Sequence, residues 1–130
     1  MPGFWNCLPR RAGVPSAPVR SGAQTPEELE TLFEDAFVVR DGGALSALFE
    51  DGAVLGAGGM EAQGGEAIAG LANELWDREL TYLAHPQRVV QSRSSALVIS
   101  AQGIHVLRRG GDGAWRSSIS LITFQHEEAP

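Results

Sequence analysis

A chain of 130 residues with 43% apolar content is long enough for one domain with one core and too short for two. Its net charge of −6 repels polyanions, which argues against nucleic acid as the main partner. The single cysteine, Cys7, excludes an internal disulfide, and no apolar run approaches the roughly 20 residues that span a bilayer. These features predict a cytoplasmic protein that does not act in a membrane.

Residues 1–24 contain four of the seven prolines, three arginines and no acidic residue, without a helical or strand period. This composition predicts a disordered leader. An alternative is a basic arm that docks on a partner through Phe4 and Trp5. Residues 125–130 are polar and are predicted to form a tail, so the folded domain is expected to span residues 25–124.

The first helix is predicted to begin at Thr25, which can cap it, with Pro26 in the first helical position and Glu28 reaching back to the cap. It should end near Arg40. An apolar stripe with helical spacing predicts the buried face, and the acidic residues, Glu30 among them, are placed on the outer side. The stripe consists of Leu29, Leu32, Phe33, Ala36 and Phe37.

Two further helices and a sheet are expected after this helix. A turn at residues 41–43 precedes a short helix over 44–49, and a third helix should run from about Gly65 to about Arg78. Glycines 58 and 59 predict a hairpin between the second and third helices. Runs rich in Val, Ile and aromatic residues then predict an antiparallel meander of strands over 80–91, 96–109 and 114–124.

Short motifs in this order resemble a known superfamily. Segments 37–45 and 48–55 each combine an acidic turn with helix or strand residues, 64–68 is similar to a third-helix entry, and 106–116 to a final hairpin. Over residues 25–124 the chain resembles the SnoaL-like branch of the nuclear-transport-factor-2-like superfamily, which includes the ketosteroid-isomerase-like cones. The resemblance implies an α+β, cystatin-like roll. Its cone-shaped, curved antiparallel sheet packs against three helices around a mostly apolar cavity, commonly in a homodimer.

One part of the chain departs from the family pattern. Relatives place two strands where this chain has only the run 96–109. Either the run makes a pinched hairpin at residues 101–103 or one strand is lost. Both outcomes would shorten the sheet and make the cavity shallower.

The resemblance argues against ketosteroid isomerisation. Relatives with that activity use a tyrosine and a carboxylate base at positions that match Phe33 and Ala57, and neither residue transfers a proton. Whether the chain is an enzyme is therefore left open, with His85 and His105 as candidate bases. The alternative is a histidine that is merely surface-exposed or partly buried. No metal-ligand spacing or phosphate-binding loop occurs, so no metal and no cofactor is expected.

A ligand inside the cone would meet both apolar and polar side chains. Phe33, Phe37 and Trp76 could form apolar walls, although aromatic residues on such stripes often belong to the core. Strand alternation places Ser118 and Ser120 on one side of the last strand, where both could bond a ligand. The alternative is that these hydroxyls bond water or the backbone.

Three functions follow as hypotheses. The first is a homodimeric module that binds a small hydrophobic or amphipathic molecule. The second is an isomerase, cyclase or hydrolase that acts on a polyketide-like or steroid-like substrate with His85 or His105 as base. The third is a non-catalytic dimerisation or docking module that uses the outer sheet face. A void of a few hundred cubic ångströms favours the first over the third.

Overall fold

The computed structural model describes residues 22–124. The predicted leader with Phe4 and Trp5, up to residue 21, and the predicted tail lie outside the described residues. Ala23 is fully buried and pairs with Trp115 in an isolated antiparallel bridge. The chain is therefore already fixed to the sheet before the first helix begins.

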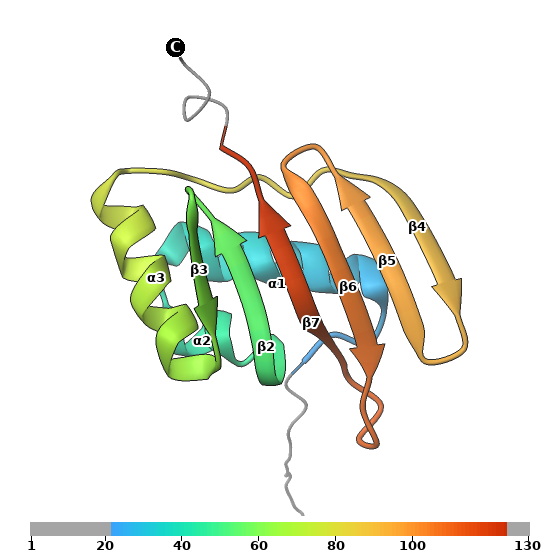
Figure 1. The fold of residues 1–130 in the computed structure, drawn as a ribbon. Helices are drawn as coiled ribbons and strands as arrows, with labels where there is room; N and C mark the ends of the chain where they lie inside the picture. The colour runs from blue at the N-terminus through green and yellow to red at the C-terminus, as the bar shows by residue number, and fades with distance from the viewer. Residues whose placement is uncertain (1–21, 125–130) are drawn as a thin grey trace, which may run out of the picture.

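Helices cover one face of a six-stranded, curved and open sheet (Figure 1). The strand order is β3-β2-β7-β6-β5-β4, in which β2 and β7 are parallel and all other neighbours are antiparallel. The predicted α+β class with three helices is confirmed. The elements are α1 (Pro26–Val39), α2 (Gly42–Ser46), β2 (Phe49–Ala57), β3 (Met60–Gln63), α3 (Gly65–Asp77), β4 (Pro86–Ser92), β5 (Ser95–Ser100), β6 (Gly103–Arg109) and β7 (Trp115–Ile122).

Helix α1 forms as its sequence predicts. The Thr25 hydroxyl accepts a hydrogen bond from the Glu28 amide at 3.1 Å, and a Glu28 carboxylate oxygen accepts one from the Gln24 amide at 2.6 Å. The helix ends at Val39, and the C-cap residue Arg40 has a left-handed φ of 60°. This capping fixes α1 across the inner face of the sheet (Figure 1).

Helix α2 is shorter than predicted. Asp41 caps it by accepting a hydrogen bond from the Ala44 amide at 3.0 Å. The helix was predicted to reach residue 49, but it ends at Ser46, and Phe49 is the first residue of β2. The reason is strand pairing: the Leu48 carbonyl accepts a hydrogen bond from the backbone amide of Ser117 in β7. Tertiary pairing therefore overrides the local helical pattern.

The run 96–109 is a pinched hairpin, one of the two predicted alternatives. Ser100 pairs with Gly103, so Ala101 and Gln102 form the turn between β5 and β6. The Gln102 side chain accepts from the Leu83 amide at 2.8 Å and donates to the Thr81 carbonyl at 3.2 Å. The run predicted as a strand over 80–91 therefore pairs only from residue 86, and its first part is a loop that Gln102 holds against the sheet.

A β-bulge changes which serines of β7 face inward. Val106 pairs with Ile119 but Leu107 pairs with Ser117, so Ser118 is an extra residue in the ladder. The bulge breaks simple alternation. The prediction that Ser118 and Ser120 share a side is therefore wrong: Ser117 and Ser120 are fully buried, and the half-buried Ser118 donates to the Val106 carbonyl at 3.2 Å.

The core lies between the inner face of the sheet and the helices, with aromatic rings at its centre. The Phe33 ring lies 6.0 Å from that of Phe49 and 6.4 Å from that of Phe37, measured between centroids. Phe37 in turn contacts the rings of Trp76 and Phe124. Over residues 22–124, no helix is both long and apolar enough to cross a membrane.

Candidate functional site

A network of buried polar groups joins α1 to the sheet. Glu30 comes from α1, Tyr82 from the loop after α3 and His105 from β6, and all three are fully buried. The Tyr82 hydroxyl donates to Glu30 Oε1. His105 Nε2 lies 3.1 Å from the same carboxylate oxygen and 3.0 Å from the tyrosine oxygen. The three polar atoms therefore contact one another in a triangle.

Serine hydroxyls extend the network across the strands. His105 Nδ1 lies 2.7 Å from Ser120 Oγ, which lies 2.7 Å from Ser117 Oγ. On the other side, the Tyr82 oxygen lies 3.1 Å from Ser100 Oγ. Because an ionised carboxylate only accepts hydrogen bonds, the Nε2 atom of His105 carries a proton. The second ring nitrogen, Nδ1, shares its hydrogen bond with the Ser120 hydroxyl.

One carboxylate oxygen of the network has no partner. Glu30 Oε2 is buried and makes no hydrogen bond within the described part of the chain. The Phe33 ring covers the network, with its centroid 4.9 Å from the Tyr82 ring and 5.1 Å from the His105 ring. The Phe33 ring therefore gives the network an apolar cover.

The electrostatics of the network keep Glu30 ionised and Tyr82 neutral. Burial is the largest single influence on Glu30 and acts to raise its pKa. Hydrogen bonds from His105 and Tyr82, with an electrostatic contribution from His105, together bring that pKa below its usual value. Burial, followed by the hydrogen bond to Glu30, raises the pKa of Tyr82 far above its ordinary value. Tyr82 is therefore a permanent donor to the carboxylate.

Ser120, His105 and Glu30 have the hydroxyl, imidazole and carboxylate order that nucleophilic catalysis uses. Their side chains, however, expose nothing to solvent. A catalytic nucleophile must touch its substrate, and a buried hydroxyl that bonds two neighbours does not. In the described structure the network ties α1 to β6 and β7.

Two members of the network were candidates from the sequence, and four were not: Glu30, Tyr82, Ser100 and Ser117. His105 and Ser120 were candidates, whereas Glu30 was placed on the outer side of α1. That placement is wrong, because Glu30 is fully buried. The missed signal is its spacing: Glu30, Phe33 and Phe37 follow the i, i+3, i+7 positions of one helix face. The part played by Tyr82 could not be predicted from the sequence, because Tyr82 lies in the loop after α3, outside any helix or strand.

The other predicted site residues lie apart from the network or around it. Phe33, Phe37 and Trp76 are buried in the core, and Trp76 Nε1 has no hydrogen-bond partner among the described residues. His85 is exposed just before β4, and its carbonyl accepts a hydrogen bond from the Ala101 amide. Ala57, at the end of β2, is buried. The ligand-binding roles predicted for Phe33, Phe37 and Trp76 stay predictions, as does the catalytic role predicted for His85.

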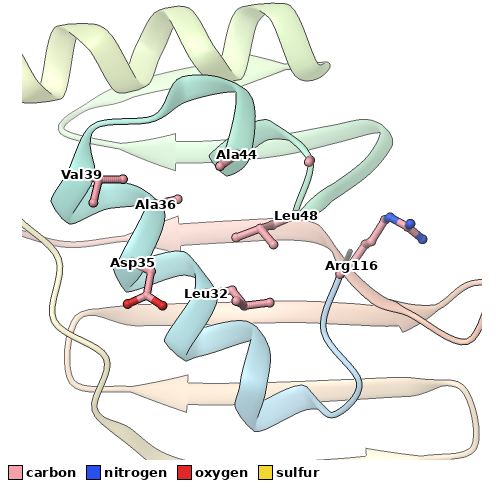
Figure 2. A pocket seen from close by; sticks show the side chains of 9 residues that line it. Leu32, Asp35, Ala36, Val39, Ala44, Leu48 and Arg116 are labelled. Carbon is pink, nitrogen blue, oxygen red and sulfur yellow. The ribbon is translucent and has the colours of Figure 1, made fainter. Parts of the chain in front are cut away.

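An open cleft lies between α1 and α2 (Figure 2), with a volume of about 420 Å³. It uses a different face of α1 from the one that carries Glu30, Phe33 and Phe37. Asp35 and Arg116 are its charged residues, and Val39 is 69% exposed beside it. The cleft is lined by Gly22, Leu32, Asp35, Ala36, Val39, Ala44, Ala47, Leu48 and Arg116.

Arg116 is held at the end of the cleft by Asp112. Its guanidinium makes two parallel hydrogen bonds to that carboxylate, at 2.8 and 3.2 Å. These bonds lower the pKa of Asp112 to about 2. Arg116 also lines a second hollow of about 380 Å³ together with Phe49, Glu50 and Asp51. An acidic hollow therefore adjoins the apolar cleft.

Comparison with solved structures shows the fold. A ketosteroid isomerase-like protein from Erwinia carotovora atroseptica has a TM-score of 0.66 at 21% identity, covering 80% of this chain and 94% of that one. A putative calcium/calmodulin-dependent protein kinase type II association domain from Thiobacillus denitrificans has a TM-score of 0.67 at 16% identity, with coverage of 81% and 98%. ActVI-ORFA from Streptomyces coelicolor has 0.58 at 15%, with 76% and 94%.

These similarities define the class of structure. The chain has the cystatin-like cone fold of the nuclear-transport-factor-2-like and ketosteroid-isomerase-like proteins, as its sequence motifs predicted. No protein-family model matches the sequence, and no curated protein matches it. The fold is shared among proteins of several names, so function has to be argued from the sites of this chain.

Proposed function

We propose that the protein binds a small amphipathic molecule in the cleft between α1 and α2. The observation that carries the proposal is a solvent-open hollow of about 420 Å³ with mostly apolar walls. Pockets for small ligands usually have volumes of about 300–1,000 Å³ and a few polar groups among apolar ones. The cleft meets both criteria.

The two charged residues of the cleft differ in their availability to a ligand. Arg116 is bonded at both terminal nitrogens to Asp112, whereas the exposed Asp35 contributes a carboxylate to the cleft. A ligand with an apolar body and a cationic or hydrogen-bond-donating end would satisfy both kinds of surface. Asp35 would then orient the ligand, and the side chains of Leu32 and Leu48 would bury its apolar part.

The lining favours binding over catalysis. Among the described lining residues only Asp35 and Arg116 ionise, and the lining contains no histidine, cysteine, serine or tyrosine. The candidate bases His85 and His105 do not line this cleft. Catalysis by a histidine base, or by a serine or cysteine nucleophile, needs those groups in contact with the substrate. The cleft therefore favours the binding hypothesis over an enzyme that uses His85 or His105 as its base.

Filling the cleft should abolish binding. Ala44 lines the cleft and is exposed, so Ala44→Trp adds a bulky side chain there without entering the core. We expect N-phenyl-1-naphthylamine, a neutral apolar fluorophore, to bind the wild type saturably and Ala44→Trp at least about tenfold more weakly, which corresponds to about 1.4 kcal/mol. A fluorescence titration measures both affinities.

Ala101→Trp is the matched control, because Ala101 is exposed in the turn between β5 and β6. It should bind the probe as the wild type does. Equal affinities for the wild type and Ala44→Trp would refute this site, and a wild type that does not saturate would refute binding of this ligand class.

We further propose that the outer face of the sheet pairs with a second copy of the chain. Cross-strand neighbours on β5, β6 and β7 place apolar residues side by side: Ile104 lies opposite Leu121, and Val106 opposite Ile119. Ile104, Ile119 and Leu121 are 42–49% exposed. We call this set the outer patch; it consists of Leu97, Ile99, Ile104, Val106, Ile119 and Leu121.

A second copy is the occupant that suits the outer patch. A contiguous apolar patch on a soluble domain marks an interaction surface. A twofold axis would place the uncharged patch of one protomer on the same patch of the other, which is the commonest way in which identical chains associate. Each protomer has a net charge of −6, but none of the charged residues belongs to the outer patch, so the patches can meet without like charges facing each other.

One charged substitution in the outer patch should dissociate the dimer. We expect Leu121→Lys to shift the mass measured by size-exclusion chromatography with light scattering from dimer to monomer at about 50 µM, because a buried unpaired ammonium is costly. Val38→Lys, at an apolar α1 residue that is 58% exposed and outside the patch, is the control and should remain dimeric. A monomeric wild type at this concentration would exclude the proposed interface.

A further inference from the structure

We propose that the cleft between α1 and α2 is also a docking site for the chain's own first 21 residues, with Phe4 and Trp5 as the side chains that enter it. This inference goes beyond small-molecule binding and holds even if no small molecule binds. If both proposals hold, the leader and the ligand compete for one site.

The first argument for this occupant is the point at which residues 1–21 join the folded domain. Gly22 is the first described residue and itself lines the cleft. The next residue is fixed, because Ala23 is fully buried and its carbonyl accepts a hydrogen bond from the Trp115 amide at 2.8 Å. Residues 1–21 are thus tethered at the wall of the cleft.

The second argument is that the chemistry of residues 1–21 complements that of the cleft. Residues 1–21 contain Phe4, Trp5 and Leu8, three arginines and no acidic residue. Since the whole chain carries −6 and this segment +3, residues 22–130 carry −9. The cleft offers apolar walls with the exposed Asp35 among them, and the hollow that adjoins it is lined by Glu50 and Asp51. Aromatic side chains would bury in the cleft while the arginines meet these carboxylates.

The tether makes even a weak contact sufficient. The 17 residue-to-residue steps from Trp5 to Gly22 span at most roughly 55 Å when extended, so the aromatic pair can reach any part of the cleft. Two groups joined by a short tether meet at an effective concentration on the order of millimolar. An intrinsic dissociation constant of about 1 mM would therefore already leave the cleft occupied half of the time.

The chain provides its own probe, because Cys7 is its only cysteine and lies two positions from Trp5. A nitroxide attached to Cys7 of the full chain should broaden the backbone amide NMR signals of cleft residues Leu32, Val39 and Ala44. The signal of Arg93, in the turn between β4 and β5, should stay sharp. Uniform broadening, or none at the cleft, would overturn the proposal.

Variants separate the proposed contact from simple proximity to Gly22. Phe4→Ser combined with Trp5→Ser should abolish the selective broadening, whereas Val14→Ser combined with Val19→Ser, the matched control in the same segment, should preserve it. Ala44→Trp should abolish it as well, because the cleft is filled. Selective broadening that persists in both the Phe4/Trp5 variant and Ala44→Trp would overturn the assignment of the occupant.

A mixed sample tests whether the contact lies within one chain. Isotope-labelled Cys7→Ser protein with spin-labelled protein at natural abundance should show no broadening of cleft signals, and selective broadening there would overturn the intramolecular contact. These measurements use no small molecule. Failure of the probe titration with success here would therefore remove the ligand proposal alone.

Discussion

Replacing Phe33 by alanine should lower the free energy of unfolding by about 3–5 kcal/mol, the range for deleting a buried aromatic side chain. Phe33 is 1% exposed, and its ring contacts those of Phe37, Phe49, Tyr82 and His105. The substitution removes apolar contacts and leaves a cavity beside the buried polar network. Urea denaturation followed by circular dichroism measures the change.

Val38→Ala on the same helix is the control for this experiment. Val38 is 58% exposed, so its truncation should change the free energy of unfolding by less than about 0.5 kcal/mol. If both variants lost the same stability, core packing would not explain the effect, and the central position of Phe33 in the core would be wrong.

Glu30→Leu should cost about 3–5 kcal/mol, because removing one partner of a buried pair leaves the other without compensation. Here the Tyr82 hydroxyl and His105 Nε2 both lose their carboxylate. Glu27→Leu, at an exposed carboxylate one turn earlier on α1, should change stability by no more than about 0.5 kcal/mol. Denaturation at pH 7 distinguishes them, and equal effects would show that the network contributes nothing specific.

The free energy of unfolding should also depend on pH differently in the wild type and in Glu30→Leu. The pKa of Glu30 is lower in the folded protein than its usual 4.5, so below that value the unfolded chain binds a proton that the folded chain does not. The stabilisation by Glu30 is complete above about pH 4.5 and is lost as the pH falls through the folded-state pKa. Between pH 6 and pH 3 the wild type should therefore lose more stability than Glu30→Leu, and parallel curves would contradict the assignment.

The sequence predicts the elements well where local chemistry decides them. Thr25, Pro26 and Glu28 are enough to place the start of α1, and the glycines at 58 and 59 place the hairpin between β2 and β3. Phe49 shows the limit of this reasoning. Its helical spacing is plain, but the pairing of β2 with β7 decides its conformation, and that pairing joins segments far apart in the chain.

The candidate site was less predictable than the helices and strands, because the fold brings its residues together from distant parts of the chain. His105 and Ser120 could be selected by residue type, but the β7 bulge that turns Ser117 inward has no glycine or other local signal. Tyr82 reaches the network from a loop whose position depends on Gln102. The cleft is formed by two helices that share no motif, so nothing in the sequence pointed to it.

The position of β7 has a consequence for biosynthesis. Among the strands described in residues 22–124, β7 is synthesised after all the others, yet it lies in the middle of the sheet. It alone among them joins the β3-β2 pair to the β6-β5-β4 meander. While the nascent chain still lacks residues 115–122, the two halves of the sheet have no shared ladder and each exposes an edge. The sheet can therefore be completed only after residues 115–122 have been synthesised, and until then the emerging polypeptide depends on protection of those edges.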